Sequence, residues 1–310
     1  MHRIDVHHHL FPPAFVAGLV DSGHYLSRGI AKSWTPQVSI EDMDAAGVAT
    51  AYTSITAPGF DVVAPARRVA ATRECNEYGA RMAADFPGRF GLFASLPLPD
   101  VDASLKEIAY ALDVLKAGGI GVLTSYRDKW LGDPAFAPVM DELDRRAAVV
   151  YVHPTTPDCC RNLMPGVADW VIEFPVDTTR TIASLLFSGT VARCPGIRFV
   201  FAHLGGILPL VVSHLSRAVE VDAQLASRTG GNILEMLKGF HYDTALRANP
   251  GALKAALELI NVRRILFGTD APLRRSAEQL QGLLEHGFSE QDLRGIEFEN
   301  ARRLFSRTGR

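Results

Sequence analysis

The stretch Val149-Val150-Tyr151-Val152-His153 decides the fold class of this 310-residue sequence. Its first four residues are apolar without alternation, which is the pattern of a strand buried on both faces of a parallel sheet. Its last residue is a histidine, a polar group placed where the strand ends. Seven similar runs lie before and after it, so that the set spans residues 4–9, 48–54, 90–96, 120–125, 149–153, 199–203, 240–244 and 265–270.

Segments with helical periodicity separate these runs. Residues 101–115 and 134–146 repeat apolar side chains at helical spacing, and Asp177-Thr178-Thr179 is expected to cap the N-terminus of another amphipathic helix. Strand and helix alternating eight times without a linker predict an α/β fold, one (β/α)8 TIM barrel over residues 1–310. We expect an extended loop insertion around residues 11–40, after the first strand.

A doubly wound open sheet is the alternative to a barrel. Such a fold usually binds nucleotides through a glycine-rich turn between a strand and a helix. Gly205-Gly206 follows the sixth strand, but the rest of that fingerprint is missing. The barrel is therefore the favoured fold.

Composition excludes several function classes. The chain has 32 basic and 34 acidic side chains, for a net charge of -2, and no block of Lys or Arg that would suit nucleic acid. No apolar run approaches the roughly 18 residues that cross a bilayer, and the charged, histidine-rich start does not resemble a signal peptide. The four cysteines match neither a zinc spacing nor a disulfide framework. We therefore expect a cytoplasmic protein that binds neither nucleic acid nor membrane.

Histidines gather at the end of the first strand, which reads Asp5-Val6-His7-His8-His9. Alternate side chains of a strand share a face, so His7 and His9 are expected to point together into the barrel mouth, with His8 pointing away. Two imidazoles at this spacing can hold one divalent metal ion. Adjacent histidines at a strand end are also common as plain surface residues.

Polar residues at three other strand ends strengthen the metal hypothesis. His153 ends the fifth strand, His203 the sixth and Asp270 the eighth. Each alone has an ordinary alternative: a hydrogen-bonded core histidine, a neighbour of a helix cap, or a helix cap itself. Together they lie at the C-terminal rim, where barrel enzymes build their sites. Nitrogen donors with one carboxylate suit Zn²⁺ best, with Mn²⁺ or Fe²⁺ as alternatives.

These residues resemble the metal-binding pattern of the amidohydrolase superfamily. The surrounding sequence is similar to the aminocarboxymuconate-semialdehyde decarboxylase-related branch, also called amidohydrolase 2. The segments that carry this resemblance are residues 4–9, 43–48, 177–180, 201–209 and 299–305. Residues 93–100 and 109–113 are most similar to 6-methylsalicylate decarboxylase-like members.

The resemblance implies a metal-dependent carboxy-lyase that decarboxylates a small aromatic acid, such as a hydroxybenzoate or salicylate, without oxidation. It assigns one divalent metal to His7, His9, His153 and Asp270. Binuclear relatives generally bridge two metals through a lysine at the end of the fourth strand, where this chain has Leu123-Thr124-Ser125-Tyr126. Subunit association as a homodimer or homotetramer is also implied.

His203 and Asp270 are the expected catalytic residues. In one version Asp270 delivers a proton to the ring carbon that bears the carboxylate, while His203 stabilises the dearomatised intermediate or activates water. In the other version, which the related muconate decarboxylase suggests, His203 generates a metal-bound hydroxide. A metal-dependent hydrolase, a lactonase or amidohydrolase acting on a small carboxylate-bearing substrate, is the alternative enzyme. A third hypothesis is a barrel without catalytic activity that only binds a metal or a partner.

Four side chains are predicted to bind substrate. Phe11, Trp34 and Tyr126 offer aromatic walls for a flat ring, although each could instead pack a long loop. Relatives often carry an arginine shortly after a Gly-Gly-x-x-Pro motif, but this chain has His214 there and Arg217 one helical turn later. This departure favours a monocarboxylate substrate over a dicarboxylate.

Overall fold

A computed structural model describes residues 2–246 and 248–306. Within these residues eight parallel strands pair in the order β1-β2-β3-β4-β7-β8-β9-β10. Their bounds are Arg3–His9 (β1), Val48–Ser54 (β2), Phe90–Ser95 (β3), Gly119–Leu123 (β4), Val149–His153 (β7), Arg198–Phe201 (β8), His241–Asp243 (β9) and Ile265–Leu266 (β10). Each falls on one of the eight apolar runs, which confirms the predicted strands.

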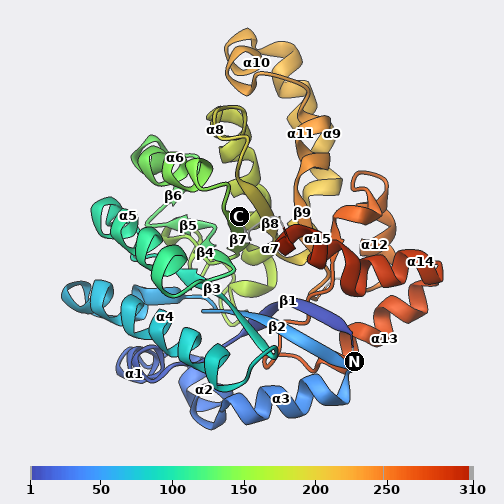
Figure 1. Ribbon diagram of the computed structural model, residues 1–310. Helices are drawn as coiled ribbons and strands as arrows, with labels where there is room; N and C mark the ends of the chain where they lie inside the picture. The colour runs from blue at the N-terminus through green and yellow to red at the C-terminus, as the bar shows by residue number, and fades with distance from the viewer. Residues whose placement is uncertain (1, 247, 307–310) are drawn as a thin grey trace.

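Contacts between the last and first strands close the sheet into a barrel. The Val6 N–H donates to the Phe267 carbonyl at 2.9 Å, and the Asp270 N–H donates to the His7 carbonyl at 2.8 Å. A parallel bridge between His8 and Ala271 continues this pairing. The predicted TIM barrel is therefore confirmed (Figure 1).

Helices surround the barrel (Figure 1). Their bounds are Pro13–Asp21 (α1), Ile30–Ser33 (α2), Pro36–Ala45 (α3), Arg68–Asp85 (α4), Val101–Ala109 (α5), Ala137–Arg145 (α6), Trp170–Phe187 (α7), Thr190–Arg193 (α8), Leu208–Val221 (α9), Ala223–Thr229 (α10), Ile233–Gly239 (α11), Pro250–Leu257 (α12), Ser276–His286 (α13), Glu290–Arg294 (α14) and Asn300–Ser306 (α15). In Figure 1, α10 projects farthest from the ring.

Helix α15 closes the N-terminal end of the barrel. Ala301 and Leu304 pack in one apolar cluster with Val6 and Phe93, which point into the barrel. The opposite end, where the strands finish, remains the place for a site.

The segment expected as a loop insertion around residues 11–40 is largely helical, because α1, α2 and the start of α3 occupy it. One element was not anticipated: a hairpin of β5 (Ser125–Tyr126) and β6 (Lys129–Trp130) follows β4. Its turn residues, Arg127 and Asp128, both have positive φ, a conformation that sequence normally signals by glycine or asparagine.

The prediction that Asp177 caps a helix is wrong. Helix α7 begins at Trp170, so Asp177 lies inside it and is fully buried. Its carboxylate accepts hydrogen bonds from the Trp130 indole at 2.7 Å and from the Ser125 hydroxyl at 3.2 Å. Asp177 therefore binds the β5–β6 hairpin instead of capping the backbone of a helix.

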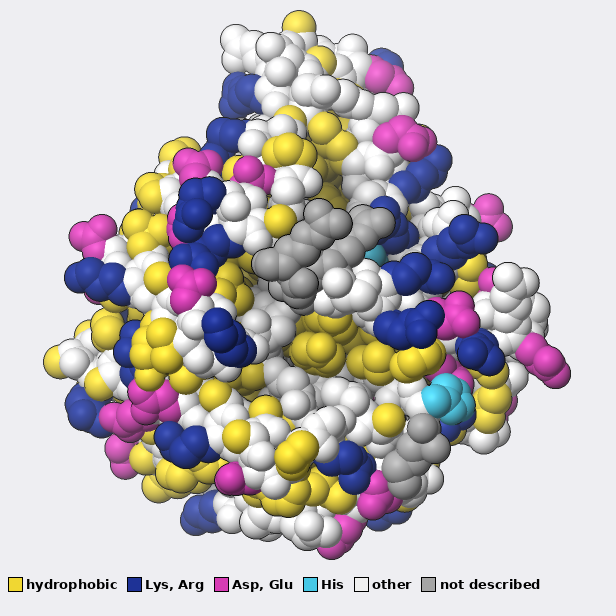
Figure 2. All heavy atoms as spheres, viewed as in Figure 1, with side chains coloured by type: hydrophobic (Ala, Val, Ile, Leu, Met, Phe, Trp, Pro, Cys, Tyr) yellow, Lys and Arg dark blue, Asp and Glu magenta, His cyan; other side chains and the backbone are white. Residues whose placement is uncertain are grey.

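Basic and acidic side chains are interspersed on the face shown in Figure 2, as the small net charge suggests. In the described part of the chain, no helix combines the length and apolar character needed to cross a membrane.

Candidate metal centre and active site

Four side chains converge at the C-terminal end of the barrel. His7 and His9 come from the end of β1, His153 from the end of β7, and Asp270 from the segment after β10. All four are buried, and one donor atom of each lies within 4.8 Å of the other three. The sequence-predicted metal set is therefore assembled in three dimensions.

Hydrogen bonds orient all three imidazoles in the same way. His9 Nδ1 lies 3.2 Å from the Ser54 carbonyl and His153 Nδ1 lies 2.8 Å from the Pro154 carbonyl. Carbonyl oxygens only accept, so both Nδ1 atoms must carry hydrogen. His7 Nδ1 lies 3.0 Å from Asp243 Oδ2 and donates in the same sense. The Nε2 atom of each ring is therefore the one that can bind a metal ion. Metal-binding histidines in other proteins are oriented in the same way, by a hydrogen bond from the other ring nitrogen.

The spacing of the donors also fits one ion. His7 Nε2 and His9 Nε2 are 3.2 Å apart, and Asp270 Oδ1 lies 3.2 Å and 3.0 Å from these two atoms. Ligands about 2.1 Å from a common metal are separated by roughly 3.0–3.4 Å in octahedral or tetrahedral geometry. The four residues therefore fit a single divalent metal site.

Protonation in the metal-free protein shows how these groups interact. Burial alone would lower the pKa of His7, but the carboxylates of Asp243 and Asp270 outweigh it and raise the pKa to about 10. Burial lowers the pKa of His9 and holds that of His153 well below its usual value. Burial would raise the pKa of Asp270, but hydrogen bonds to His7 and His9 hold it well below its ordinary value. A metal ion would take the place of one proton.

Asp243, at the end of β9, supports the centre and was not singled out from sequence. It is fully buried, and Oδ1 accepts hydrogen bonds from the backbone N–H groups of His203 at 3.1 Å and Ala245 at 2.9 Å. Its other oxygen holds His7. The available signal was a carboxylate one residue before the end of the seventh predicted strand, close to the kind of position that identified His153.

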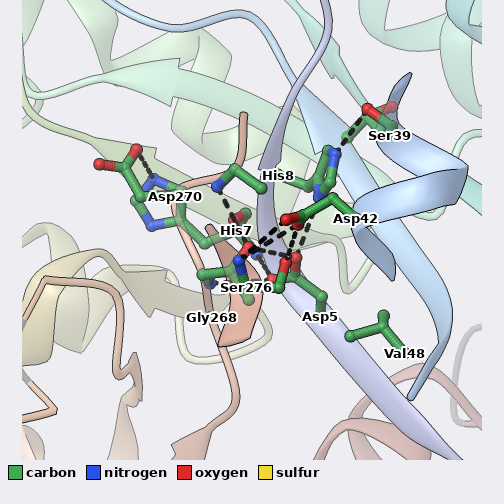
Figure 3. A network of polar contacts seen from close by, with 12 residues as sticks. Asp5, His7, His8, Ser39, Asp42, Val48, Gly268, Asp270 and Ser276 are labelled. Atoms are coloured by element: carbon green, nitrogen blue, oxygen red, sulfur yellow. Dashed lines mark hydrogen bonds and ion pairs between the residues drawn. The ribbon is translucent and has the colours of Figure 1, made fainter. Parts of the chain in front are cut away.

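His8 points away from the cluster, as predicted, yet it is completely buried. It lies 3.1 Å from Asp5 Oδ2 through Nδ1 and 2.8 Å from the Ser39 hydroxyl of α3 through Nε2. Figure 3 shows this side chain on the opposite side of β1 from Asp270. Asp5 also accepts the His7 N–H at 3.0 Å, so this network fixes the backbone that carries the ligands.

His203 stands beside the four donors without joining their group. Its ring centroid is 4.9 Å from that of His7 and 5.9 Å from that of His153. His203 and Asp270 both have positive φ, 56° and 67°, which is uncommon for residues other than glycine. Such conformations cluster at functional sites, where the surrounding structure holds them.

A cavity of about 270 Å³, called the mouth cavity below, opens over the cluster. His153, His203 and Asp270 line it together with Tyr25, Trp170 and Phe174. Arg274 at its edge lies 3.8 Å from Glu278 and is about half exposed. The mouth cavity thus combines metal donors, a histidine outside the donor group and aromatic walls.

The four residues predicted to bind substrate have different surroundings. Tyr126 lines a small second cavity next to His153. Phe11 and Trp34 are buried with their ring centroids 6.1 Å apart, inside the core near α1 and α3 rather than along either cavity. Arg217 lies on α9, where its side chain is 70% exposed and pairs with Glu220 at 2.9 Å. The structure brings only Tyr126 of these four to a cavity lined by a metal donor.

Comparisons with known proteins show similarity over nearly the whole chain. A family model described as amidohydrolase matches residues 4–307. The 6-methylsalicylic acid decarboxylase acuB of Aspergillus aculeatus is 35% identical, over 99% of this chain and 97% of that protein. The 6-methylsalicylic acid decarboxylase of Penicillium expansum is 34% identical, over 88% and 85%. A dihydroxybenzoic acid decarboxylase from Polaromonas sp., solved with manganese and the inhibitor 2-nitroresorcinol, is 21% identical with a TM-score of 0.87, over 98% and 97%.

Proposed function

This chain belongs to the amidohydrolase family, and on that premise we propose that it is a metal-dependent carboxy-lyase. It would release CO₂ without oxidation from a small hydroxybenzoate of the salicylate type. The two fungal relatives reported above are decarboxylases of such an acid.

The observation that carries the proposal is the placement of the donor cluster beneath an aromatic-walled cavity. The mouth cavity measures about 270 Å³. Benzene occupies an engineered cavity of about 150 Å³, so a benzoate ring fits here with its carboxylate near the cluster. The walls formed by Tyr25, Trp170 and Phe174 suit a flat ring.

We assign one divalent metal to His7, His9, His153 and Asp270. When bound, it would act as a Lewis acid that holds the substrate carboxylate and neighbouring oxygen and draws negative charge from the ring. Three imidazole nitrogens and one carboxylate favour zinc, and manganese is the competing identity because the Polaromonas relative holds it. Elemental analysis of the purified protein decides between them.

We assign proton transfer to Asp270 and His203, which face the mouth cavity together. The low pKa of Asp270 means that it is ionised before substrate binds. It can therefore accept the proton of an ortho hydroxyl and return it to the ring carbon that bears the carboxylate. The C–C bond then breaks, CO₂ leaves, and the bonding electron pair restores the aromatic ring. His203 would donate hydrogen bonds to the charge that develops on the ring oxygen.

Two separate substitutions test these roles. Asp270→Asn should abolish CO₂ release and weaken metal binding, whereas His203→Ala should lower kcat by about 10²–10⁴-fold with the metal still bound. Normal turnover by either variant at full metal content would contradict the assigned role.

The reaction class is tested by incubating the metal-loaded enzyme with a panel of hydroxybenzoates and, in parallel, a panel of lactones. We expect CO₂ and the corresponding phenol in equal amounts from the hydroxybenzoates. Lactone hydrolysis with no CO₂ release from any hydroxybenzoate would instead establish the enzyme as a hydrolase.

We also propose that the protein is a cytoplasmic homodimer or homotetramer. Apolar side chains are exposed along the segment before and at the start of α7, including Leu163, Met164 and Ile172 at 62%, 51% and 47%. Contiguous exposed apolar surface favours association. Light scattering after size-exclusion chromatography should give two or four chains per particle, and a single chain would contradict this proposal.

A further inference from the structure

The histidines of the metal cluster are held by different kinds of hydrogen-bond acceptor. His7 binds the Asp243 carboxylate directly. His9 and His153 bind backbone carbonyl groups instead. The carbonyl that holds His153 belongs to the next residue, Pro154, and lies 2.8 Å from Nδ1. The orientation of the His153 ring therefore depends on the orientation of this peptide group.

The peptide group between Pro154 and Thr155 is held from its other side by Thr124. The Pro154 carbonyl and the Thr155 N–H belong to one planar unit, so neither can turn without the other. The Thr155 N–H donates to Thr124 Oγ1 at 3.0 Å. Thr124, the residue after β4, also donates its own N–H to the His153 carbonyl at 2.9 Å. Thr124 therefore fixes the backbone on both sides of Pro154.

The Thr124 hydroxyl continues this path to a buried carboxylate. It donates to Asp177 Oδ2 at 2.5 Å, and Asp177 has no exposed surface. The same carboxylate accepts hydrogen bonds from Ser125 at 3.2 Å, from Trp130 at 2.7 Å and from Arg180 at 3.0 Å. Four donors, one of them a guanidinium, are the surroundings of an ionised carboxylate, which can only accept.

All hydrogen bonds along this path run in the same direction. His153 Nδ1–H donates to the 154–155 peptide group, whose N–H donates to Thr124, whose hydroxyl donates to Asp177. A group that donates its hydrogen becomes a better acceptor, which strengthens each further bond by about 10–30%. All four side chains are buried, so water does not screen the path. The Asp177 charge thus acts on His153 in the same sense as Asp243 acts on His7.

We propose that Asp177 is a positioning residue of the metal centre, connected to His153 by a hydrogen-bond relay through Thr124 and the 154–155 peptide group. The relay keeps His153 Nε2 directed at the other donors and strengthens its bond to a divalent metal, as direct carboxylate partners of histidine ligands do. The proposal rests on the metal centre assigned under the proposed function, and it adds two residues that do not touch the metal.

Two substitutions break the relay at different hydrogen bonds. Thr124→Val keeps the shape of the side chain but leaves the Thr155 N–H without its acceptor, so the peptide group can turn away from His153. Its Kd for Zn²⁺, measured by competition with a chelator, should rise about tenfold, the lower end of the range for altered partners of metal ligands. Asp177→Asn removes the charge and should raise this Kd about three- to tenfold. Thr124→Ser keeps the hydroxyl and should restore binding to within about twofold of wild type.

Each variant has a matched control elsewhere in the chain. Thr72→Val removes an equally buried hydroxyl, which donates to the Arg68 carbonyl within α4 at 2.8 Å. Glu107→Gln removes the charge of a buried carboxylate that also binds an arginine, Arg73. Both controls should lower stability in denaturant unfolding and leave the Kd for Zn²⁺ unchanged.

The hydrogen on His153 Nδ1 provides a spectroscopic readout of the relay. Its proton resonance can be recorded on protein labelled in the histidine nitrogens, both metal-free and loaded with zinc. We expect it to move upfield in Thr124→Val and in Asp177→Asn, because its acceptor is turned away or weakened. The His9 Nδ1 proton, whose acceptor is the Ser54 carbonyl, should keep its resonance in both variants.

An unchanged Kd for Zn²⁺ in both variants, or an unchanged His153 resonance, would overturn the proposal. Equal losses of affinity in Thr124→Ser and Thr124→Val, or in the controls, would also overturn it, because they would show general destabilisation. If one variant does not fold, the other still breaks the relay. A wild-type protein that binds no zinc would overturn the metal centre instead, and the resonance of the metal-free protein would still decide the relay. None of these measurements uses turnover, so the decarboxylase function is tested separately.

Discussion

Replacing Asp243 by asparagine should weaken metal binding although Asp243 itself is not a ligand. Asp243 Oδ1 accepts two backbone N–H groups, those of His203 and Ala245, so the amide oxygen of asparagine should take that place. The amide NH₂ would then face His7 Nδ1, now 3.0 Å from Oδ2. His7 would have to accept there and carry its hydrogen on Nε2, the atom that the metal needs.

The expected loss follows from the kind of hydrogen bond removed. Asp243 and His7 have no exposed surface. The Asp243 carboxylate is charged because burial, which would raise its pKa, is outweighed by His7 and the His203 backbone N–H, which lower it. Hydrogen bonds to charged groups contribute about 1.5–3 kcal/mol, and about 1.4 kcal/mol equals a tenfold change in Kd. We therefore expect metal Kd to rise about 10- to 100-fold, the range found when other hydrogen-bond partners of metal ligands are changed.

Competition against a chelator of known affinity measures this Kd. Glu107→Gln is the matched control, because Glu107 is equally buried but binds Asn76 and Arg73, remote from the histidines. The control should lose stability without losing metal affinity. An Asp243→Asn protein that is folded by circular dichroism and binds metal within twofold of wild type would refute the proposed role of Asp243.

Three further predictions concern metal and stability. Because the pKa of His7 is raised to about 10 in the metal-free protein, stability due to its protonation is present below about pH 6.5 and is lost as pH rises towards 10. Metal affinity should rise over the same interval with release of one proton, measurable by calorimetry in buffers of different ionisation enthalpy. Chelation should lower the midpoint of thermal unfolding by several degrees, since metal at 100 times its Kd contributes about 2.7 kcal/mol. Leu304→Ala, at the opposite end of the barrel, should cost about 2–5 kcal/mol in denaturant unfolding with metal affinity unchanged.

The strands and the donor cluster were predictable because their signals are local. Continuous apolar runs identify strands buried on both faces, and a polar residue at the end of such a run points to the rim of the barrel. His153 and Asp270 were found in this way. The hairpin at residues 125–130 was missed because Arg127 and Asp128 form its turn without glycine.

Residues whose roles depend on partners distant in sequence were harder to predict. Aspartate is a residue type that often caps helices, so Asp177 was predicted to be a cap. Its hydrogen-bond partners, Ser125 and Trp130, lie about 50 residues away in the sequence. Asp243 meets His7 only after the barrel has closed. The sequence does not tell whether an aromatic side chain near a strand end packs into the core or lines a cavity. The structure shows that Phe11 and Trp34 pack together in the core, whereas Tyr126 lines a cavity.

The central claim is that one divalent metal, held by His7, His9, His153 and Asp270, enables decarboxylation at the mouth cavity. It is tested most directly by titrating metal into the metal-free protein while recording CO₂ release from carboxyl-labelled 6-methylsalicylate. The account predicts that turnover rises linearly and reaches its plateau at one metal per chain. Full turnover by the metal-free protein, or a plateau only at two metals per chain, would contradict it.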